Sequence, residues 1–443
     1  MPVPLSAPPP LLAALGGVDG ITTALVAVAV IMLVAQALGG LLERVGQPRV
    51  IGEILGGIAL GPSLLGAMAP GLAASLFGPA VRPQLDLLGQ LGLALFMFLI
   101  GLELNPALLR GRLPMASRIT AVGIALPLVL GVGLADLLER WLPDLIPGDH
   151  TLAGALFMGT AMAITAFPVL ARILQDRGLT GQPLGALAIT VAAIDDLVSW
   201  ILLAAVVAFA RTGSAWGAPT PLLRTALWAL LLLVGLQPLR RWLEASYRRR
   251  GDLSPLVQTS LLAGALLSGA VTEWIGVHLI FGAFLWGLAM PRHAPLRQTL
   301  ELRLQTVVVQ LMLPLFFAVS GLNTRLMALD SPQLWAATLL VLLVAVTGKF
   351  AGTWVTARLS GVPAREAQAL GWLVNTRGLT ELVILNVGLS LGVISTTLFS
   401  IGVLMAIGTT LMTGPLLGRL GYPRSSASSS TASTTSGERK RSA

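Results

Sequence analysis

Two adjacent aspartates, Asp195 and Asp196, interrupt an apolar run that extends from Ala186 to Ala204. The run is long enough to cross a bilayer as a helix. A single carboxylate at the centre of a bilayer costs about 2.5–3.5 kcal/mol on insertion scales, and two adjacent carboxylates also repel each other. We therefore interpret the pair as functional rather than structural.

Lys349 also lies inside an apolar run, and apart from Lys440 it is the only lysine in a chain that otherwise uses arginine. A buried ammonium can lose its proton, whereas a guanidinium stays charged. Since a helix turns by about 100° per residue, Asp195 and Asp196 cannot both face the same partner. We expect one aspartate to hold Lys349 and the other to face a water-filled cavity.

Two further apolar runs contain residues that interrupt a helix. One holds Pro168, which removes a backbone donor, and Thr165 offers a hydroxyl beside it. The other contains the segment Asn375–Glu381, which places Arg377, Gly378 and Glu381 at a depth that a continuous lipid-facing helix would not tolerate. Interrupted spans in corresponding halves of a chain are typical of transporter binding sites.

The composition indicates a membrane protein. Of 443 residues, 55% are hydrophobic and 11% are charged, and the mean hydropathy is +0.83. The chain has no cysteine, which excludes disulfides, thiolate metal sites and cysteine nucleophiles, and its three histidines are too few for a histidine metal site. We expect neither an enzyme nor a bound cofactor. The net charge of +9 comes from arginines between apolar runs, so we expect no nucleic-acid partner.

Windows of about 20 residues identify roughly thirteen apolar spans and predict an all-α polytopic membrane protein. Their approximate limits are 21–42, 50–67, 86–104, 117–137, 151–174, 183–210, 221–243, 254–273, 276–291, 301–322, 333–358, 366–392 and 394–418. Arginines concentrate on alternate connections, which predicts an outside N-terminus and a cytoplasmic C-terminus in the plasma membrane. We expect a short N-terminal segment (1–20) and a disordered cytoplasmic tail (421–443) around the membrane domain.

A short internal repeat supports this reading. Leu95–Asn105 closes the third span and resembles Leu315–Asn323, which closes the tenth. Each interrupted run lies two spans after its copy of the repeat. An offset of seven spans reverses orientation, so the two halves are predicted to be inverted repeats, each with one broken helix.

These features resemble the second large family of monovalent cation:proton antiporters, which includes sodium/proton antiporters, potassium efflux systems and plant cation/proton exchangers. The likeness covers about residues 20–420. It rests on Gln47–Gly66, Ala163–Leu174, Asp195–Asp196, Gly276–Leu285, Gly348–Lys349 and Asn375–Leu382.

The resemblance implies a membrane domain over 21–420 that divides into a mobile core and a dimerisation scaffold. The core would contain the two broken helices, which cross, and the protein would form a homodimer and work by an elevator-like movement. From it we expect a core at about 86–210 and 301–418 and a scaffold at about 21–67 and 221–291.

The resemblance also implies roles for individual residues. Asp196 would be the main cation-binding carboxylate, Asp195 would pair with Lys349, and Thr165 would help to coordinate the cation. Glu381 matches an acidic position of the family beside the second break. Arg377 and Glu381, four residues apart, can equally be a buried ion pair that holds the broken helix.

The chemistry expected of this site is exchange without a covalent step. Burial disfavours the charged carboxylate and a nearby ammonium favours it, so cation and proton compete for the same oxygens. We predict two protons per cation, hence electrogenic exchange, because both the Asp195 and Lys349 positions can carry charge. Oxygen ligands suit sodium, lithium or potassium, and the sequence leaves the ion open.

Two other functions share some of these sequence features. An intramembrane aspartyl protease also places two aspartates in a membrane, but it needs them on different helices, where they share a proton across the substrate. A potassium efflux system or channel is the second alternative, although such efflux systems typically carry a C-terminal nucleotide-binding domain. Gly56–Gly61 is not a dinucleotide fingerprint, because no βαβ unit surrounds it, and helix packing explains it better.

Overall fold

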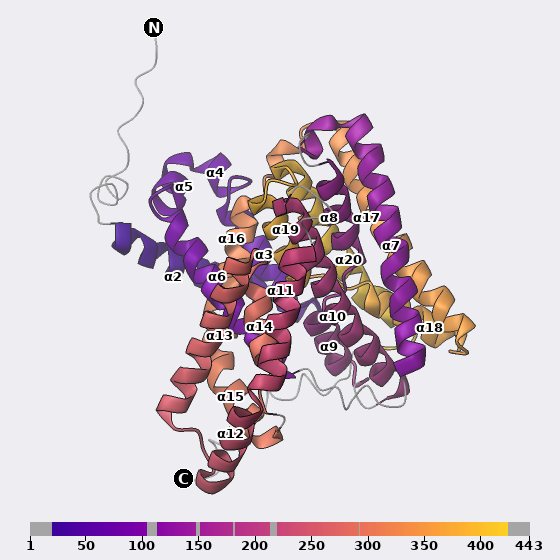
Figure 1. The fold of residues 1–443 in the computed structure, drawn as a ribbon. Coiled ribbons are helices and arrows are strands. Elements are labelled where there is room, and N and C mark those ends of the chain that lie inside the picture. Colours follow the sequence, from indigo (N-terminus) through magenta and orange to yellow (C-terminus); the bar gives the residue numbers. More distant parts are fainter. Residues whose placement is uncertain are drawn as a thin grey trace, which may run out of the picture.

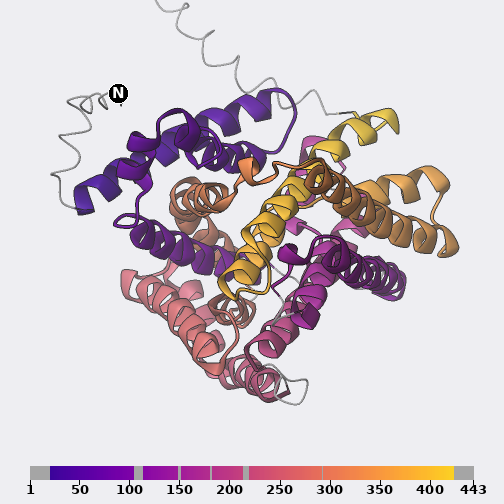
Figure 2. The same cartoon turned by 90° about the horizontal axis from the view of Figure 1, so that it is seen from above.

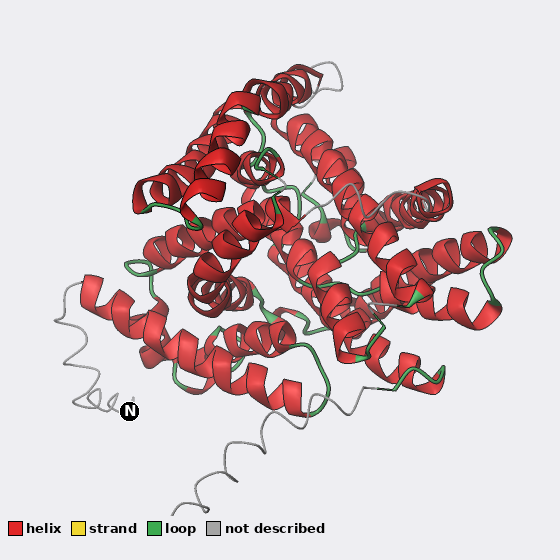
Figure 3. Ribbon diagram, turned by 90° about the horizontal axis from the view of Figure 1, so that it is seen from below, coloured by secondary structure: helices red, strands yellow, loops and turns green. Residues whose placement is uncertain are grey.

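A computed structural model describes residues 20–103, 113–147, 151–179, 182–212, 219–291 and 293–423. The predicted N-terminal segment, except for its last residue, and the predicted tail beyond residue 423 lie outside these ranges. Within them, the regular secondary structure is entirely helical, as Figure 3 shows. This confirms the predicted all-α class.

Nine helices in the described ranges are long and apolar enough to cross a membrane. Seven of these are α2 (Gly20–Arg44), α6 (Arg82–Glu103), α7 (Leu113–Trp141), α10 (Pro183–Thr212), α13 (Pro255–Ile275), α17 (Pro332–Leu359) and α20 (Thr396–Arg419). The other two combine α3 (Arg49–Leu60) with α4 (Leu65–Met68), and α15 (Ala294–Val307) with α16 (Leu313–Asn323).

A tenth span results if α11 (Pro219–Leu230) and α12 (Gln237–Arg250), which meet at a 42° bend, are counted together. The remaining expected spans correspond to shorter helices, namely α14 (Leu279–Leu288) and the pairs described next. The short α5 (Pro70–Phe77) lies between two spans. The exact number of thirteen therefore stays a prediction.

Both predicted breaks are present. The first separates α8 (Thr151–Ala163) from α9 (Phe167–Asp176), and the second separates α18 (Ala364–Val374) from α19 (Leu379–Ser390). Pro168 is the second residue of α9, a position in the first helical turn where its missing N–H would have no helical partner. The first break therefore comes just before the proline.

Serine side chains define where several helices begin. Ser254, Ser331 and Ser395 each accept a hydrogen bond from the backbone N–H three residues later, at the starts of α13, α17 and α20. Such caps satisfy one of the four N–H groups that a helix start leaves without a helical partner. These caps fix the starts of α13, α17 and α20 at the connections before them.

The helices pack in two groups. The first group consists of α7 to α10 and α17 to α20, and the second contains α2, α3, α6, α13, α14 and α16. In Figure 1, α7, α17 and α18 lie at the right, whereas α2 and α13 lie at the left. In the perpendicular view of Figure 2, the indigo N-terminal helices again lie opposite the orange α17 and α18.

Two helices of the predicted core make their main contacts in the second group. The predicted core includes α6 and α16, but in the structure α6 packs against α14, and α16 packs against α3. Glycines explain the close approach: a Cβ on Gly101 would lie 2.3 Å from the Phe284 carbonyl oxygen, and one on Gly287 would lie 2.2 Å from that of Phe98. The predicted division into core and scaffold concerns which helices move together, and it stays a prediction.

The contact between α3 and α16 provides a stability test. A Cβ on Gly57 would lie 2.4 Å from the Ala318 carbonyl oxygen, so Gly57→Ala forces two backbones apart. We expect this variant to lose about 1–3 kcal/mol of stability. Gly40 on α2 has no atom within 4 Å of an added Cβ, so Gly40→Ala should be neutral or slightly stabilising. Thermal unfolding of the purified proteins in detergent measures both; equal unfolding temperatures would contradict the packing role of Gly57.

Candidate functional site

Asp195 on α10 forms a fully buried ion pair with Lys349 on α17. The Lys349 Nζ lies 2.8 Å from Asp195 Oδ1, and the two side chains are 0% and 1% exposed. The other carboxylate oxygen, Oδ2, accepts a hydrogen bond of 2.8 Å from the backbone N–H of Thr165 in the first break. Both oxygens of Asp195 are therefore engaged, which leaves a second role to its neighbour.

Asp196 is also buried but points to a different part of the molecule. The backbone N–H of Phe167, the first residue of α9, donates to its carboxylate. Its Oδ1 has no hydrogen-bond partner among the described residues. A buried carboxylate oxygen without a partner loses its hydration and gains nothing in return, so it is a candidate for binding an ion or a water.

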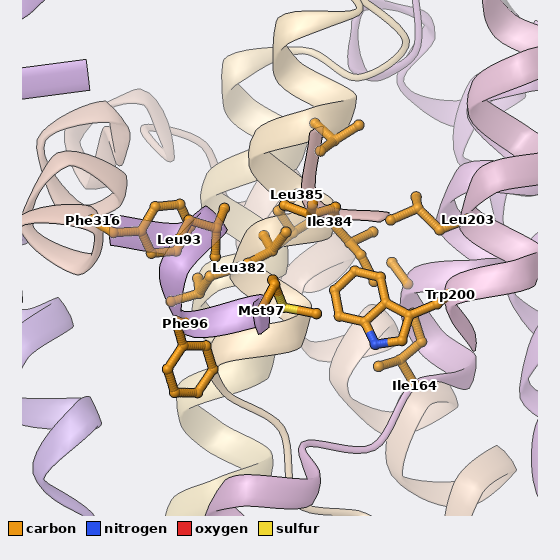
Figure 4. Packing of buried hydrophobic residues seen from close by; sticks show 14 of the residues in the cluster. Leu93, Phe96, Met97, Ile164, Trp200, Leu203, Phe316, Leu382, Ile384 and Leu385 are labelled. Atoms are coloured by element: carbon orange, nitrogen blue, oxygen red, sulfur yellow. The ribbon is translucent and has the colours of Figure 1, made fainter. Parts of the chain in front are cut away.

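The cavity beside Asp196 lies between the two packing groups. Its other walls come from α6, α10 and α19, through Phe96, Met97, Ile100, Trp200, Thr380 and Val383. Figure 4 shows Met97 pointing toward the indole ring of Trp200. The cavity measures about 10 Å³, close to the volume needed for one water centre. Asp196 thus faces a small cavity, and apolar α6 side chains form one of its walls.

The side chains of Lys349 and Arg377 bind the buried C-terminal end of α8. Lys349 Nζ donates to the carbonyl of Ala163, and Arg377 donates to the carbonyls of Ala161 and Met162, the latter two bonds measuring 2.7 and 2.5 Å. The last carbonyls of a helix lack helical partners and carry its partial negative charge. Lys349 and Arg377 therefore stabilise the broken end of α8 as well as their acidic partners.

The two breaks cross and bond to each other. The backbone N–H of Ala166 donates to the Thr376 carbonyl at 2.9 Å, and the Thr165 hydroxyl donates to the Val374 carbonyl at 2.8 Å. Thr410 of α20 accepts the Arg377 N–H at 3.0 Å. These bonds satisfy backbone groups that would otherwise be unpaired at membrane depth. In this structure the Thr165 hydroxyl therefore holds the crossing together.

Arg377 and Glu381 form the second buried ion pair, with Nη1 2.9 Å from Oε2. This agrees with the structural reading of the pair as a support for the broken helix. Asn375, at the end of α18, is fully buried, and neither atom of its side-chain amide finds a partner among the described residues. Its role as a supporting residue stays a prediction.

Sequence reasoning missed two kinds of site residue. Thr410 has no local signal, because it is one of many hydroxyl residues in α20. Phe96 and Met97 belong to a continuous apolar run, and only their position opposite Asp196 gives them importance. The separate surroundings of Asp195 and Asp196 also argue against a protease, since the two carboxylates do not face one substrate from different helices.

Comparisons with known proteins agree with this geometry. Residues 25–421 match the family described as "Sodium/hydrogen exchanger, transmembrane". The chain is 45% identical over 395 residues to the Na(+)/H(+) antiporter NhaS4 of Synechocystis sp., covering 89% of this chain and 96% of that protein. It is 39% identical over 400 residues to cation/H(+) antiporter 20 of Arabidopsis thaliana, covering 88% of this chain but 47% of the relative.

A solved structure shares the fold. The sodium proton antiporter MjNhaP1 from Methanocaldococcus jannaschii, determined at pH 8, superposes with a TM-score of 0.65 over 90% of this chain and 98% of that one, at 15% identity. The chain spans nearly all of the cyanobacterial relative but about half of the plant one. These matches confirm the resemblance to cation:proton antiporters: this chain belongs to the transmembrane sodium/hydrogen exchanger family.

Proposed function

We propose that this protein exchanges a monovalent cation for protons across the membrane. The observation that carries the proposal is a buried Asp195–Lys349 ion pair next to Asp196, whose Oδ1 has no partner among the described residues, at the crossing of two broken helices. The same carboxylate can hold a proton or a cation, but not both. Competition at Asp196 then couples the two fluxes, and no cofactor is required.

The ion pair supplies a second titrating element. When Asp195 and Lys349 are paired, the ammonium is neutralised by a partner 2.8 Å away. A cation that draws Asp195 toward itself weakens this contact, and a desolvated lysine then releases its proton more easily. Asp196 and Lys349 together would thus release two protons for each cation bound, with Thr165 keeping the crossing in place.

Alternating access would come from a movement between the two packing groups. We propose that α7 to α10 and α17 to α20 form the mobile unit, because they hold all five buried ionisable side chains of the site, namely Asp195, Asp196, Lys349, Arg377 and Glu381. The remaining helices would form the scaffold, with α6 closing one side of the Asp196 cavity. As the resemblance implies, the scaffold would also mediate a homodimer.

The proposed setting is a plasma membrane, with the N-terminus outside and the C-terminus in the cytoplasm. Arginine on alternate connections supports this orientation. The transported ion is proposed to be Na⁺, K⁺ or both, with Li⁺ as a further candidate. This range is supported by the two relatives, of which one is named as a sodium/proton antiporter and the other as a cation/proton antiporter.

Proteoliposomes containing the purified protein test the proposal. A pH gradient is established, and Na⁺, Li⁺ or K⁺ is added while a fluorescent dye reports the internal pH. Exchange appears as collapse of the gradient that depends on both the cation and the protein. If none of the three cations collapses the gradient, the proposed function is wrong; if K⁺ flux proceeds without proton movement, an efflux or channel function is favoured.

The proposed stoichiometry makes a separate prediction. Two protons per monovalent cation move one net charge per cycle, so exchange should respond to an imposed membrane potential. We expect Asp195→Asn to reduce this response, because it removes the charge that retains the Lys349 proton. Exchange rates at several potassium/valinomycin potentials, with Na⁺ as the substrate, measure the effect. A wild-type rate independent of potential would exclude the two-to-one ratio.

A further inference from the structure

Ser199 on α10 carries a buried hydroxyl that is close to the two aspartates in the helical repeat. It is 1% exposed, and its Oγ has no hydrogen-bond partner among the described residues. At about 100° per residue, its direction falls roughly 40° beyond Asp195 and 60° short of Asp196. Helical side chains lean toward the N-terminus, so this hydroxyl leans back toward both carboxylates.

Other hydroxyl residues inside these helices behave differently. Thr190 on α10 donates to the Ala186 carbonyl at 2.8 Å, and Ser400 on α20 donates to the Thr396 carbonyl at 2.9 Å. A buried hydroxyl within a helix commonly donates its hydrogen bond to the carbonyl four residues earlier. Ser199 makes no such bond, and its unpaired oxygen thus remains available to a ligand.

The wall of the cavity beside Asp196 itself contains another hydroxyl residue. Thr380, in the first turn of α19, is 5% exposed and lines the cavity with Asp196. Trp200, one turn after Asp196, lines it too, and its indole Nε1 has no partner among the described residues. The site therefore combines carboxylate and hydroxyl oxygens with one N–H donor.

These groups have distinct chemical uses. Carboxylate and hydroxyl oxygens are hard ligands of the kind that alkali cations bind, and the cavity has space for one sphere of water size. An indole N–H cannot bind a cation, but it can donate to a water that occupies the cavity when no cation is bound. The cavity therefore holds either one cation or one water.

We propose that the hydroxyls of Ser199 and Thr380 are direct ligands of the transported cation, together with Asp196, and that Trp200 holds the water that replaces the cation when the site is free of it. This inference rests on the proposed function and adds to it a ligand set that spans α10 and the second broken helix. Ser199 and Thr380 then set affinity and selectivity among Na⁺, Li⁺ and K⁺, whereas Asp196 carries the exchangeable charge.

The test measures exchange in proteoliposomes as a function of cation concentration. Ser199→Ala and Thr380→Val should each raise the apparent KM for the preferred cation roughly tenfold, since each removes one oxygen that binds a charge. The rate at saturating cation and its pH dependence should stay as in the wild type, because a hydroxyl does not titrate in this range. Thr380→Ser keeps the oxygen and should restore the KM.

Thr190→Val is the matched control, because it removes a hydroxyl from the same helix that already bonds to its own backbone. Its KM should stay at the wild-type value. If Ser199→Ala does not fold, as judged by size-exclusion chromatography, then Thr380→Val and Thr380→Ser decide the outcome. A purely structural role would lower the unfolding temperature without changing the KM.

The possible failures are distinguishable. If both hydroxyl variants keep the wild-type KM while Asp196→Asn is inactive, the ligand assignment is wrong and the proposed function stands. If the wild-type protein exchanges none of the three cations, both are wrong. A KM increase in Thr190→Val equal to that in Ser199→Ala would also overturn the assignment.

Discussion

Asp196→Asn is expected to lower cation-dependent proton flux by roughly 100-fold or more for every cation, since a charge-assisted contact contributes about 1.5–3 kcal/mol and the amide cannot carry the exchanged proton. The substitution preserves shape and can still accept the Phe167 N–H, so the protein should fold normally. Proteoliposome assays, with unfolding temperature as a check on folding, give the measurement.

Asp136→Asn is the matched control for this experiment. Asp136 lies on α7, in the same proposed mobile unit, and forms an exposed pair with Arg140 at 2.9 Å. Exposed pairs contribute little to stability, so flux and unfolding temperature should both stay near wild type. Normal exchange by Asp196→Asn would refute the assignment of Asp196 as the site at which cation and proton compete.

Lys349→Met is expected to give the largest loss of stability, about 3–5 kcal/mol, because it leaves Asp195 charged, buried and without its cation. The carbonyl of Ala163 at the end of α8 also loses its donor. Unfolding in detergent, followed by tryptophan fluorescence against temperature or denaturant, measures the change.

A double-mutant cycle separates the charge from the packing. Asp195→Asn with Lys349→Met replaces the buried pair by two neutral side chains, so the double variant should be more stable than Lys349→Met alone. Asp195→Asn alone leaves an unpaired ammonium and should also be destabilising. If the two single losses simply add in the double variant, the ion pair seen in the structure does not contribute to stability.

Helix periodicity predicts the directions of the two aspartates but not their partners. It indicates that Asp195 and Asp196 point about 100° apart, but not which of them meets Lys349, because that contact joins residues 154 positions apart. The resemblance to known antiporters assigned the pair to Asp195, and the structure has the same contact. Its accompanying bond to the Ala163 carbonyl has no sequence signal, since any helix end offers such a group.

The grouping of the helices by packing also depends on contacts between residues that are far apart in the sequence. Every span is apolar, because lipid and protein neighbours select the same side chains, so composition does not distinguish a helix of one unit from a helix of the other. The position of α6 depends on glycine contacts such as that between Gly101 and Phe284, which act over almost 200 residues of sequence. Local sequence patterns do not predict such a contact.

The sequence by itself determined the membrane class, the two helix breaks and the residues that can titrate, because hydropathy, proline and buried charge act through local physical chemistry. Only the tertiary structure decided how these residues are used. It pairs Asp195 with Lys349, places the Lys349 and Arg377 side chains at the end of α8, and leaves Asp196 facing a small cavity that Phe96 and Met97 line. Those assignments depend on which helix faces lie together, and packing between distant segments alone fixes them.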